Sequence, residues 1–202
     1  MVAKFILLIA CLFAFQSPKS KTILFFGDSL TAGYGLSVDE AFPALIEKEL
    51  QKSGLAVKAV NAGLSGETSA GGLSRIDWIL RQPIDIMVLE LGANDGLRGL
   101  PLDQTKQNLQ GIIDKVKAKY PNCKIVLAGM MVPPNLGKDY TNQFKNIYPN
   151  LAKKNNSTLI PFLLEGVAGD EKLNLTDGIH PNVEGHKIVA KNLVKVLQPL
   201  LN

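Results

Sequence analysis

The serine in the stretch Gly27-Asp28-Ser29-Leu30 is the first residue that could carry chemistry. It follows five strand-forming residues, 22–26, and an apolar run that ends in glycine and small polar residues is typical of a buried strand leading into a loop. The carboxyl ends of the strands in an α/β sheet face ligands, so a hydroxyl placed there could attack a substrate. Ser29 is therefore a candidate nucleophile, although an isolated Gly-Asp-Ser also fits a simple turn or a helix N-cap.

A serine hydroxyl needs a base, and the sequence contains two histidines. His180 comes three residues after Asp177, in a turn that contains Gly178. The carboxylate can then reach the imidazole Nδ1, which would fix the tautomer and stabilise the imidazolium. His186 has no such partner nearby, and we expect it to lie on the surface of the last helix.

Two further loops offer N–H groups that could stabilise an oxyanion. Residues 61–69 include Gly66, whose backbone N–H could be presented at the start of a helix. The apolar run 86–91 leads to Asn94, whose side-chain amide can donate. Together with the backbone N–H of Ser29 these groups would surround one carbonyl, and the loss of one such donor typically lowers kcat by about 10²–10³-fold.

The elements that must position these residues alternate between strand and helix patterns. Parallel strands need a crossover of helical size, so this alternation predicts parallel pairing. We expect an α/β fold: a three-layer α/β/α sandwich around a flavodoxin-like five-stranded parallel sheet in the order 2-1-3-4-5. The candidate strands are residues 22–26, 57–61, 85–91, 124–130 and 158–162.

This strand order makes one geometric demand. The fifth strand lies three places from the first, which is roughly 14 Å at the usual strand spacing. Residues 165–181 must therefore cross back over the edge of the sheet to bring His180 to Ser29. A segment of this length can span that distance.

Three local signals predict where helices begin and end. Ser37 and Glu40 have the spacing of a capping box, which predicts that the first helix starts there. Pro149 should end, kink or begin a helix. The last helix should run from about Val183, and Pro181 can begin it.

The composition indicates one globular core. The 202 residues are 46% hydrophobic and 20% charged, which suits one sizeable domain. The net charge of +4 comes from scattered basic residues. This distribution argues against a nucleic-acid partner and allows only a loose contact with an anionic membrane surface. A monomer is the default expectation for a chain of this size.

The first twenty residues differ from the rest. Lys4 precedes the unbroken apolar segment 5–15, which is shorter than the ~20 residues of a membrane-spanning helix and has the proportions of a secretory h-region. We expect residues 1–20 to be a signal peptide of a periplasmic or secreted protein, and residues 21–202 to form a single domain. A short anchor helix and a lipoprotein anchored at Cys11 are the alternatives. Conventional cleavage would leave Cys123 alone, without a disulfide partner.

Other functional classes fit the residues less well. The Gly-x-Ser-x-Gly elbow of α/β-hydrolases fails at Glu67 in the stretch Gly63-Leu64-Ser65-Gly66-Glu67. Two histidines and one mature cysteine give no metal-ligand cluster, so we expect no metal and no cofactor. A non-catalytic lipid- or glycan-binding module stays open as an alternative.

The four elements together resemble the SGNH, or GDSL, hydrolase family. The motif residues are Gly27-Asp28-Ser29-Leu30, Gly66, Asn94, and Asp177 with His180. The resemblance implies Ser29 as nucleophile, His180 as base, Asp177 as its orienting carboxylate, and an oxyanion hole of Ser29, Gly66 and Asn94.

Residues 94–99 and 177–182 are similar to the periplasmic thioesterase, protease and lysophospholipase branch of this family and to bacterial arylesterases. The resemblance implies hydrolysis of a small-molecule acyl ester or thioester through an acyl-enzyme, with a carbohydrate O-deacetylase as an alternative because this family also includes that activity. It covers nearly the whole mature chain and is weakest at residues 131–135 and 165–175.

Several apolar residues close to these motifs could floor an acyl groove, although each could equally be ordinary packing at the base of a loop. We expect substrate contacts from Tyr34, Leu97, Leu100 and Pro133, and the same argument extends to Pro101, Met131, Val132 and Pro134.

Overall fold

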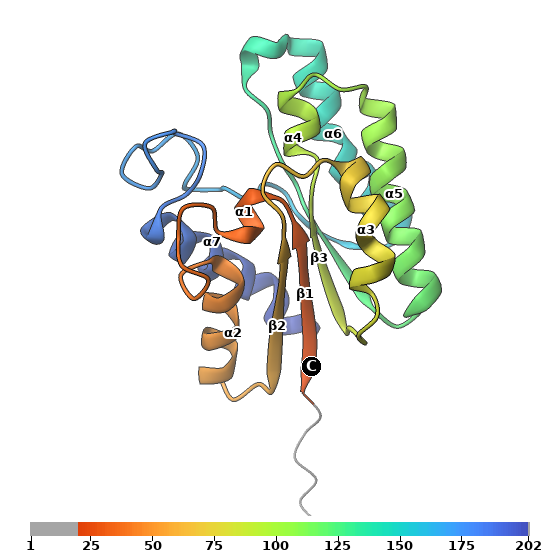
Figure 1. The fold of residues 1–202 in the computed structure, drawn as a ribbon, viewed down its shortest axis with the longest axis vertical. Helices are drawn as coiled ribbons and strands as arrows, with labels where there is room; N and C mark the ends of the chain where they lie inside the picture. The colour runs from red at the N-terminus through yellow and green to blue at the C-terminus, as the bar shows by residue number, and fades with distance from the viewer. Residues whose placement is uncertain (1–19, 202) are drawn as a thin grey trace, which may run out of the picture.

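The computed structural model describes residues 20–201, so the expected signal peptide lies, apart from Ser20, outside the described residues. Five parallel strands form one sheet in the order β2-β1-β3-β4-β5, which confirms the predicted order (Figure 1). The strands are β1 (Lys21–Gly27), β2 (Val57–Gly63), β3 (Ile86–Glu90), β4 (Lys124–Ala128) and β5 (Thr158–Ile160).

Helices cover both faces of the sheet. One face carries α2 (Phe42–Lys52) and α7 (Val183–Leu197), and the other carries α3 (Ser69–Ile79), α5 (Leu102–Lys119) and α6 (Lys138–Asn155) (Figure 1). Two short helices, α1 (Ser29–Ala32) and α4 (Ala93–Leu97), lie at the carboxyl ends of β1 and β3. Between residues 20 and 201 we find no helix that is long and apolar enough to cross a membrane.

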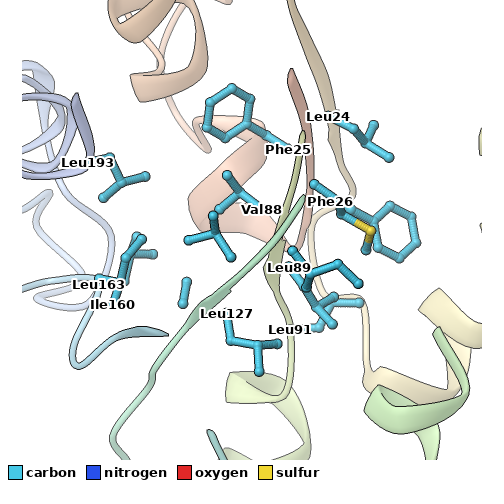
Figure 2. Close-up of a cluster of buried hydrophobic side chains, with 14 of the residues drawn as sticks. Leu24, Phe25, Phe26, Val88, Leu89, Leu91, Leu127, Ile160, Leu163 and Leu193 are labelled. Carbon is cyan, nitrogen blue, oxygen red and sulfur yellow. The ribbon is translucent and has the colours of Figure 1, made fainter. Parts of the chain in front are cut away.

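The core lies on both sides of the central strands. Successive side chains point to opposite faces, so Phe25 and Phe26 serve different layers (Figure 2). The ring of Phe25 meets that of Phe42 in α2 edge to face, with centroids 5.7 Å apart, while the guanidinium of Arg75 in α3 lies 4.3 Å from the centroid of Phe26. Strand β3 is buried along its whole length and ends in a buried acidic residue, Glu90.

The prediction that the first helix starts at Ser37 is wrong. The Ser37 hydroxyl does donate to the Glu40 carboxylate, at 2.6 Å, but this contact closes a separate turn in which the Glu40 N–H donates to the Ser37 carbonyl. The helix α2 begins at Phe42, and Pro43 lies in its first turn, where a missing N–H costs nothing.

Neither Pro149 nor Pro181 marks the first or last residue of a helix. Helix α6 neither begins nor ends at Pro149 but continues through it, with Tyr148 and Leu151 buried on either side. Helix α7 begins at Val183 as predicted, yet its N-cap is Asn182 rather than Pro181. The Asn182 side chain accepts the N–H groups of the first turn, so a side-chain cap, not the proline, starts the helix.

His186 is not a surface residue, which corrects the sequence prediction. It is 1% exposed, its ring stacks on that of Phe42, and its Nδ1 accepts the backbone N–H of Phe42 at 3.1 Å. This N–H belongs to the first turn of α2 and has no partner within that helix. His186 therefore ties α7 to the start of α2, and burial, followed by repulsion from His180, lowers its pKa to about 4.

We predict that His186 makes the protein sensitive to acid. Between the ordinary pKa of 6.5 and the folded value of about 4, the unfolded chain binds the proton and the folded chain does not. The free energy of unfolding therefore falls as the pH drops through this window, by up to about 3 kcal/mol from this group. Thermal unfolding across this pH range should show a smaller acid loss in His186→Asn, whose amide oxygen can still accept the Phe42 N–H.

The matched control is His180→Asn, which removes the other histidine and should keep the acid loss. Buried carboxyl groups with raised pKa values, such as Asp28 and Glu90, change the free energy of unfolding in the opposite direction as the pH falls. The contribution of each histidine is therefore measured as the difference in acid loss between its variant and the parent. Equal acid sensitivity of the parent and His186→Asn would contradict the prediction.

Candidate active site

Ser29 lies at the junction between the end of β1 and the start of α1. The strand ends at Gly27, and the Asp28 carboxylate caps the helix by accepting the Leu30 N–H at 3.0 Å through Oδ1. Ser29 is the first residue of α1, which makes it both a first-turn residue and a hydroxyl at the carboxyl end of the sheet. The cap is Asp28, so Ser29 is free of that local role.

The loop before α7 brings an imidazole to this hydroxyl. His180 Nε2 lies 2.9 Å from the Ser29 Oγ, and its Nδ1 lies 2.8 Å from Asp177 Oδ2. The segment after β5 therefore crosses back over the edge of the sheet to Ser29, as the predicted strand order required. The buried Asn174 holds this segment, because its amide donates to the carbonyls of Val167 and Asp170.

Both oxygens of the Asp177 carboxylate have hydrogen-bond partners. Its Oδ1 accepts the backbone N–H groups of Ile179 and His180, each at 3.0 Å, and its Oδ2 faces the imidazole. Burial acts to raise the pKa of Asp177, but the hydrogen bonds from His180 and Ile179 outweigh it and lower the pKa to about 2. Asp177 is therefore ionised throughout the range in which a folded enzyme works, and it holds His180 Nδ1 as the donor.

Asn94 and Gly66 reach the same place from two other strands. Asn94 lies in α4, and its Nδ2 donates to Asp28 Oδ2 at 3.1 Å, which leaves the second amide hydrogen for another acceptor. Gly66 has φ +78°, a backbone conformation that favours glycine. It is not at the start of α3 as expected, since that helix begins at Ser69, but it lines the same cavity as Ser29 and Asn94.

A buried polar network fixes these two loops relative to each other. Asp95, next to Asn94, accepts both the backbone N–H of Ser69 (2.8 Å) and its hydroxyl (2.5 Å). Thr105 of α5 donates to the same carboxylate at 3.2 Å, and Asn108 donates to the Ser69 hydroxyl. No local sequence signal reveals this network, because its members look like ordinary residues at the starts of helices until the fold brings them together.

Beside Ser29 and His180 opens a cavity of about 770 Å³ with a mainly apolar lining. Six of the eight expected contact residues line it: Tyr34, Leu97, Met131, Val132, Pro133 and Pro134. The centroid of the Tyr34 ring lies 4.6 Å from that of His180. Pro101 is not among the lining residues. Leu100 does not line the cavity, which corrects the expectation. Its carbonyl instead accepts the Tyr140 hydroxyl at 3.0 Å, at the start of α5.

The segment after β5 supplies part of the lining that the sequence analysis did not single out. Phe162, Leu164 and Ile179 all face the cavity. The only signal for them was their position between the last strand and His180, which the crossing segment had to occupy. Within residues 20–201 no group of three or more His, Cys, Asp or Glu side chains is arranged to hold a metal ion.

Comparison with known proteins gives a consistent result. The model of the GDSL-like lipase/acylhydrolase family matches residues 25–188. Esterase TesA of Pseudomonas aeruginosa is 38% identical over 187 residues, with 92% of each chain covered. Thioesterase 1/protease 1/lysophospholipase L1 of Escherichia coli is 41% identical over 192 residues, covering 95% of this chain and 90% of the relative.

A solved structure agrees in fold. The psychrotrophic esterase EstA from Pseudoalteromonas, in a structure inhibited by monoethylphosphonate, superposes with a TM-score of 0.85 at 33% identity, covering 91% of this chain and 100% of that one. A family match over most of the chain, close relatives over nearly its full length and the same fold leave one conclusion: the chain belongs to the GDSL-like lipase/acylhydrolase family and is an acyl hydrolase of the GDSL type.

Proposed function

We propose that the protein hydrolyses carboxylic esters and thioesters with Ser29 as nucleophile, His180 as general base and Asp177 as the carboxylate that orients the base. The observation that carries the proposal is the pair of contacts from one imidazole: 2.9 Å from Nε2 to the Ser29 hydroxyl and 2.8 Å from Nδ1 to Asp177. With Nδ1 protonated, Nε2 is the acceptor for the serine proton.

Each step then has an assigned group. Ser29 Oγ attacks the acyl carbonyl while His180 takes its proton, and the resulting oxyanion is held by the backbone N–H groups of Ser29 and Gly66 and by the Asn94 amide. His180 returns the proton to the leaving alcohol or thiol as the C–O or C–S bond breaks. Water, activated by the same imidazole, then cleaves the acyl-enzyme. No step of this mechanism uses a metal or a cofactor.

Because the cavity is mainly apolar, we expect it to bind the acyl chain of the substrate. Tyr34, Leu97 and Pro133 are the proposed contacts. The names of the relatives, an esterase and a thioesterase with lysophospholipase activity, support both oxygen and sulfur leaving groups. An acetylated carbohydrate would meet few polar partners in this lining, which makes O-deacetylation the weaker candidate.

We further propose that residues 21–202 are the hydrolase domain, that the chain acts as a monomer and that residues 1–20 direct it to the periplasm or outside the cell. The apolar segment 5–15 with its positive start supports export. Anchoring through Cys11 is the less favoured alternative, since apolar residues continue beyond that cysteine to Phe15.

The test is covalent trapping. A p-nitrophenyl alkylphosphonate should release one p-nitrophenol per chain, abolish turnover of p-nitrophenyl acyl esters and acyl-CoA thioesters, and leave its mass on the peptide that contains Ser29. Phosphonates are apt probes because their tetrahedral phosphorus resembles the intermediate. Ser29→Ala should gain no mass. Complete labelling with full remaining activity, or labelling at another residue that abolishes activity, would refute the proposal.

A further inference from the structure

Glu90 is a fully buried carboxyl group that the mechanism does not use. It is the last residue of β3 and is 0% exposed. Its Oε2 accepts the Thr31 hydroxyl at 2.8 Å and the Asp28 N–H at 3.1 Å. In the part of the chain that the structure describes, no ion pair includes Glu90. A buried carboxylate without a cation is costly, so this side chain calls for an explanation.

The strand geometry around Glu90 is adapted to it. Glu90 is paired with Gly27 of β1 in the sheet register. A Cβ atom at Gly27 would collide with both the Thr31 hydroxyl and the Glu90 carboxyl, so only glycine leaves room for this hydrogen bond. The glycine of the Gly-Asp-Ser stretch thus makes space for a contact between β3 and α1, the helix that begins with Ser29.

The second oxygen of Glu90 suits a protonated group better than a charged one. Oε1 is buried and has no hydrogen-bond partner in the described structure, which is costly for a carboxylate oxygen and less so for the hydroxyl oxygen of a neutral acid. The neighbouring Asp28 carboxyl is also buried, at 1% exposure. Two adjacent buried carboxyl groups do not both ionise readily. Burial, and then the charge of Asp28, raise the pKa of Glu90 well above its ordinary value.

The Asp28 carboxylate is the natural acceptor for a hydrogen bond from this protonated group. Burial raises the pKa of Asp28 to about 6, and hydrogen bonds from Leu30, Glu90 and Asn94 oppose that rise. The other titratable groups near this pair are His180, whose charge lowers the pKa of Asp28, and the buried Tyr148 of α6, which Asp28, Glu90 and Asp95 all influence. Glu90 therefore keeps the proton, and Asp28 carries the negative charge.

We propose that Glu90 is a positioning residue: as a neutral carboxylic acid it donates a hydrogen bond to Asp28 and so keeps Asp28 the acceptor that orients the Asn94 amide. The proposal rests on the function proposed above, in which that amide holds the oxyanion. Asn94 Nδ2 gives one hydrogen to Asp28 Oδ2, at 3.1 Å, and the other is directed elsewhere. If Asp28 were protonated or displaced, the amide could rotate and present its oxygen to the oxyanion instead.

The test compares Glu90→Gln with Glu90→Met. Glutamine reproduces a neutral acid, because its oxygen can accept from Thr31 and Asp28 and its NH₂ can donate to the Asp28 carboxylate, so kcat should stay close to that of the parent. Methionine fills the site without a donor and should lower kcat about 10- to 100-fold with little change in KM, less than the loss of a whole oxyanion donor. The acid limb of its kcat profile should also move to higher pH.

A double-mutant cycle separates this role from a general structural one. Because Glu90 acts through Asn94, adding Glu90→Met to Asn94→Ala should cost little further activity. Additive losses, or a Glu90→Gln variant as impaired as Glu90→Met while both show the circular dichroism and unfolding temperature of the parent, would overturn the proposal.

An infrared measurement makes the test independent of activity. Above neutral pH the folded parent should show the carbonyl stretch of a protonated carboxylic acid, and Glu90→Gln should lack it. Absence of this band in the parent would overturn the assignment even if every variant of Glu90 failed to fold. The band does not depend on the role of Ser29, so failure of this inference and failure of the proposed hydrolysis can be told apart.

Discussion

Replacing Ser29 with alanine is expected to lower kcat for a p-nitrophenyl ester by about 10⁴- to 10⁶-fold. The hydroxyl is the only group within hydrogen-bond distance of His180 Nε2 among the described contacts, so no second nucleophile is poised to replace it. The oxyanion donors and the cavity remain in the variant, and they should sustain only a slow attack by water. Initial rates at saturating substrate measure the effect.

The matched control for this variant is Ser74→Ala. Ser74 is an exposed serine of α3 whose hydroxyl donates to the Gly71 carbonyl, so its loss should leave kcat unchanged. Ser29 lies in the four-residue helix α1, so the variant must be shown to be folded. Circular dichroism and thermal unfolding should match those of the parent. Activity near that of the parent in a folded, contaminant-free preparation would end the assignment of Ser29 as nucleophile.

The sheet could be predicted from the sequence because its signals are local. Each strand is a short apolar run, each connection has helical spacing, and parallel pairing follows from the size of the crossovers. The positions of Ser29, Asn94 and His180 at strand ends or in the returning loop then follow from the topology. The distance between Ser29 and His180 does not follow, since it depends on how residues 165–181 pack.

The residues that were misjudged are those whose partners lie far along the chain. His186 looked like a surface residue because its partner, the N–H of Phe42, is 144 residues away. Glu90 and Asp95 were passed over for the same reason, since their partners come from α1, α3 and α5. Buried polar groups are satisfied by tertiary contacts, and hydrophobic periodicity carries no information about such contacts.

Apolar loop residues were predictable only in part. Leu97 and Leu100 are similar in type, near in sequence and both partly exposed, but Leu97 ends α4 facing the cavity and Leu100 lies just before α5. Which of the two could meet a substrate depends on where the short helix ends. A pattern that places both in one loop cannot distinguish them.

Replacing Asp177 with asparagine is expected to lower kcat by about 10³–10⁴-fold. Asparagine keeps the size of the side chain, and its oxygen can still accept the N–H groups of Ile179 and His180. Its NH₂ group then faces His180 Nδ1, which must become the acceptor. The ring proton moves to Nε2, and Nε2 can no longer take the proton of Ser29. The low end of the range is favoured because the Asp177 side chain is 37% exposed, so water can replace part of the lost interaction.

The matched control is Asp170→Asn, since Asp170 lies in the same returning segment and its exposed side chain accepts only the local Lys172 N–H. Ser29→Ala combined with Asp177→Asn should be no slower than Ser29→Ala alone, because the carboxylate acts only through the imidazole and the imidazole only through the serine. The Asp177 pKa of about 2 means that the acid limb of the parental profile is not the titration of this carboxylate. If Asp177→Asn kept the parental kcat and raised only KM, Asp177 would be a substrate-binding group, and the chain of proton transfer through His180 would need another orienting partner.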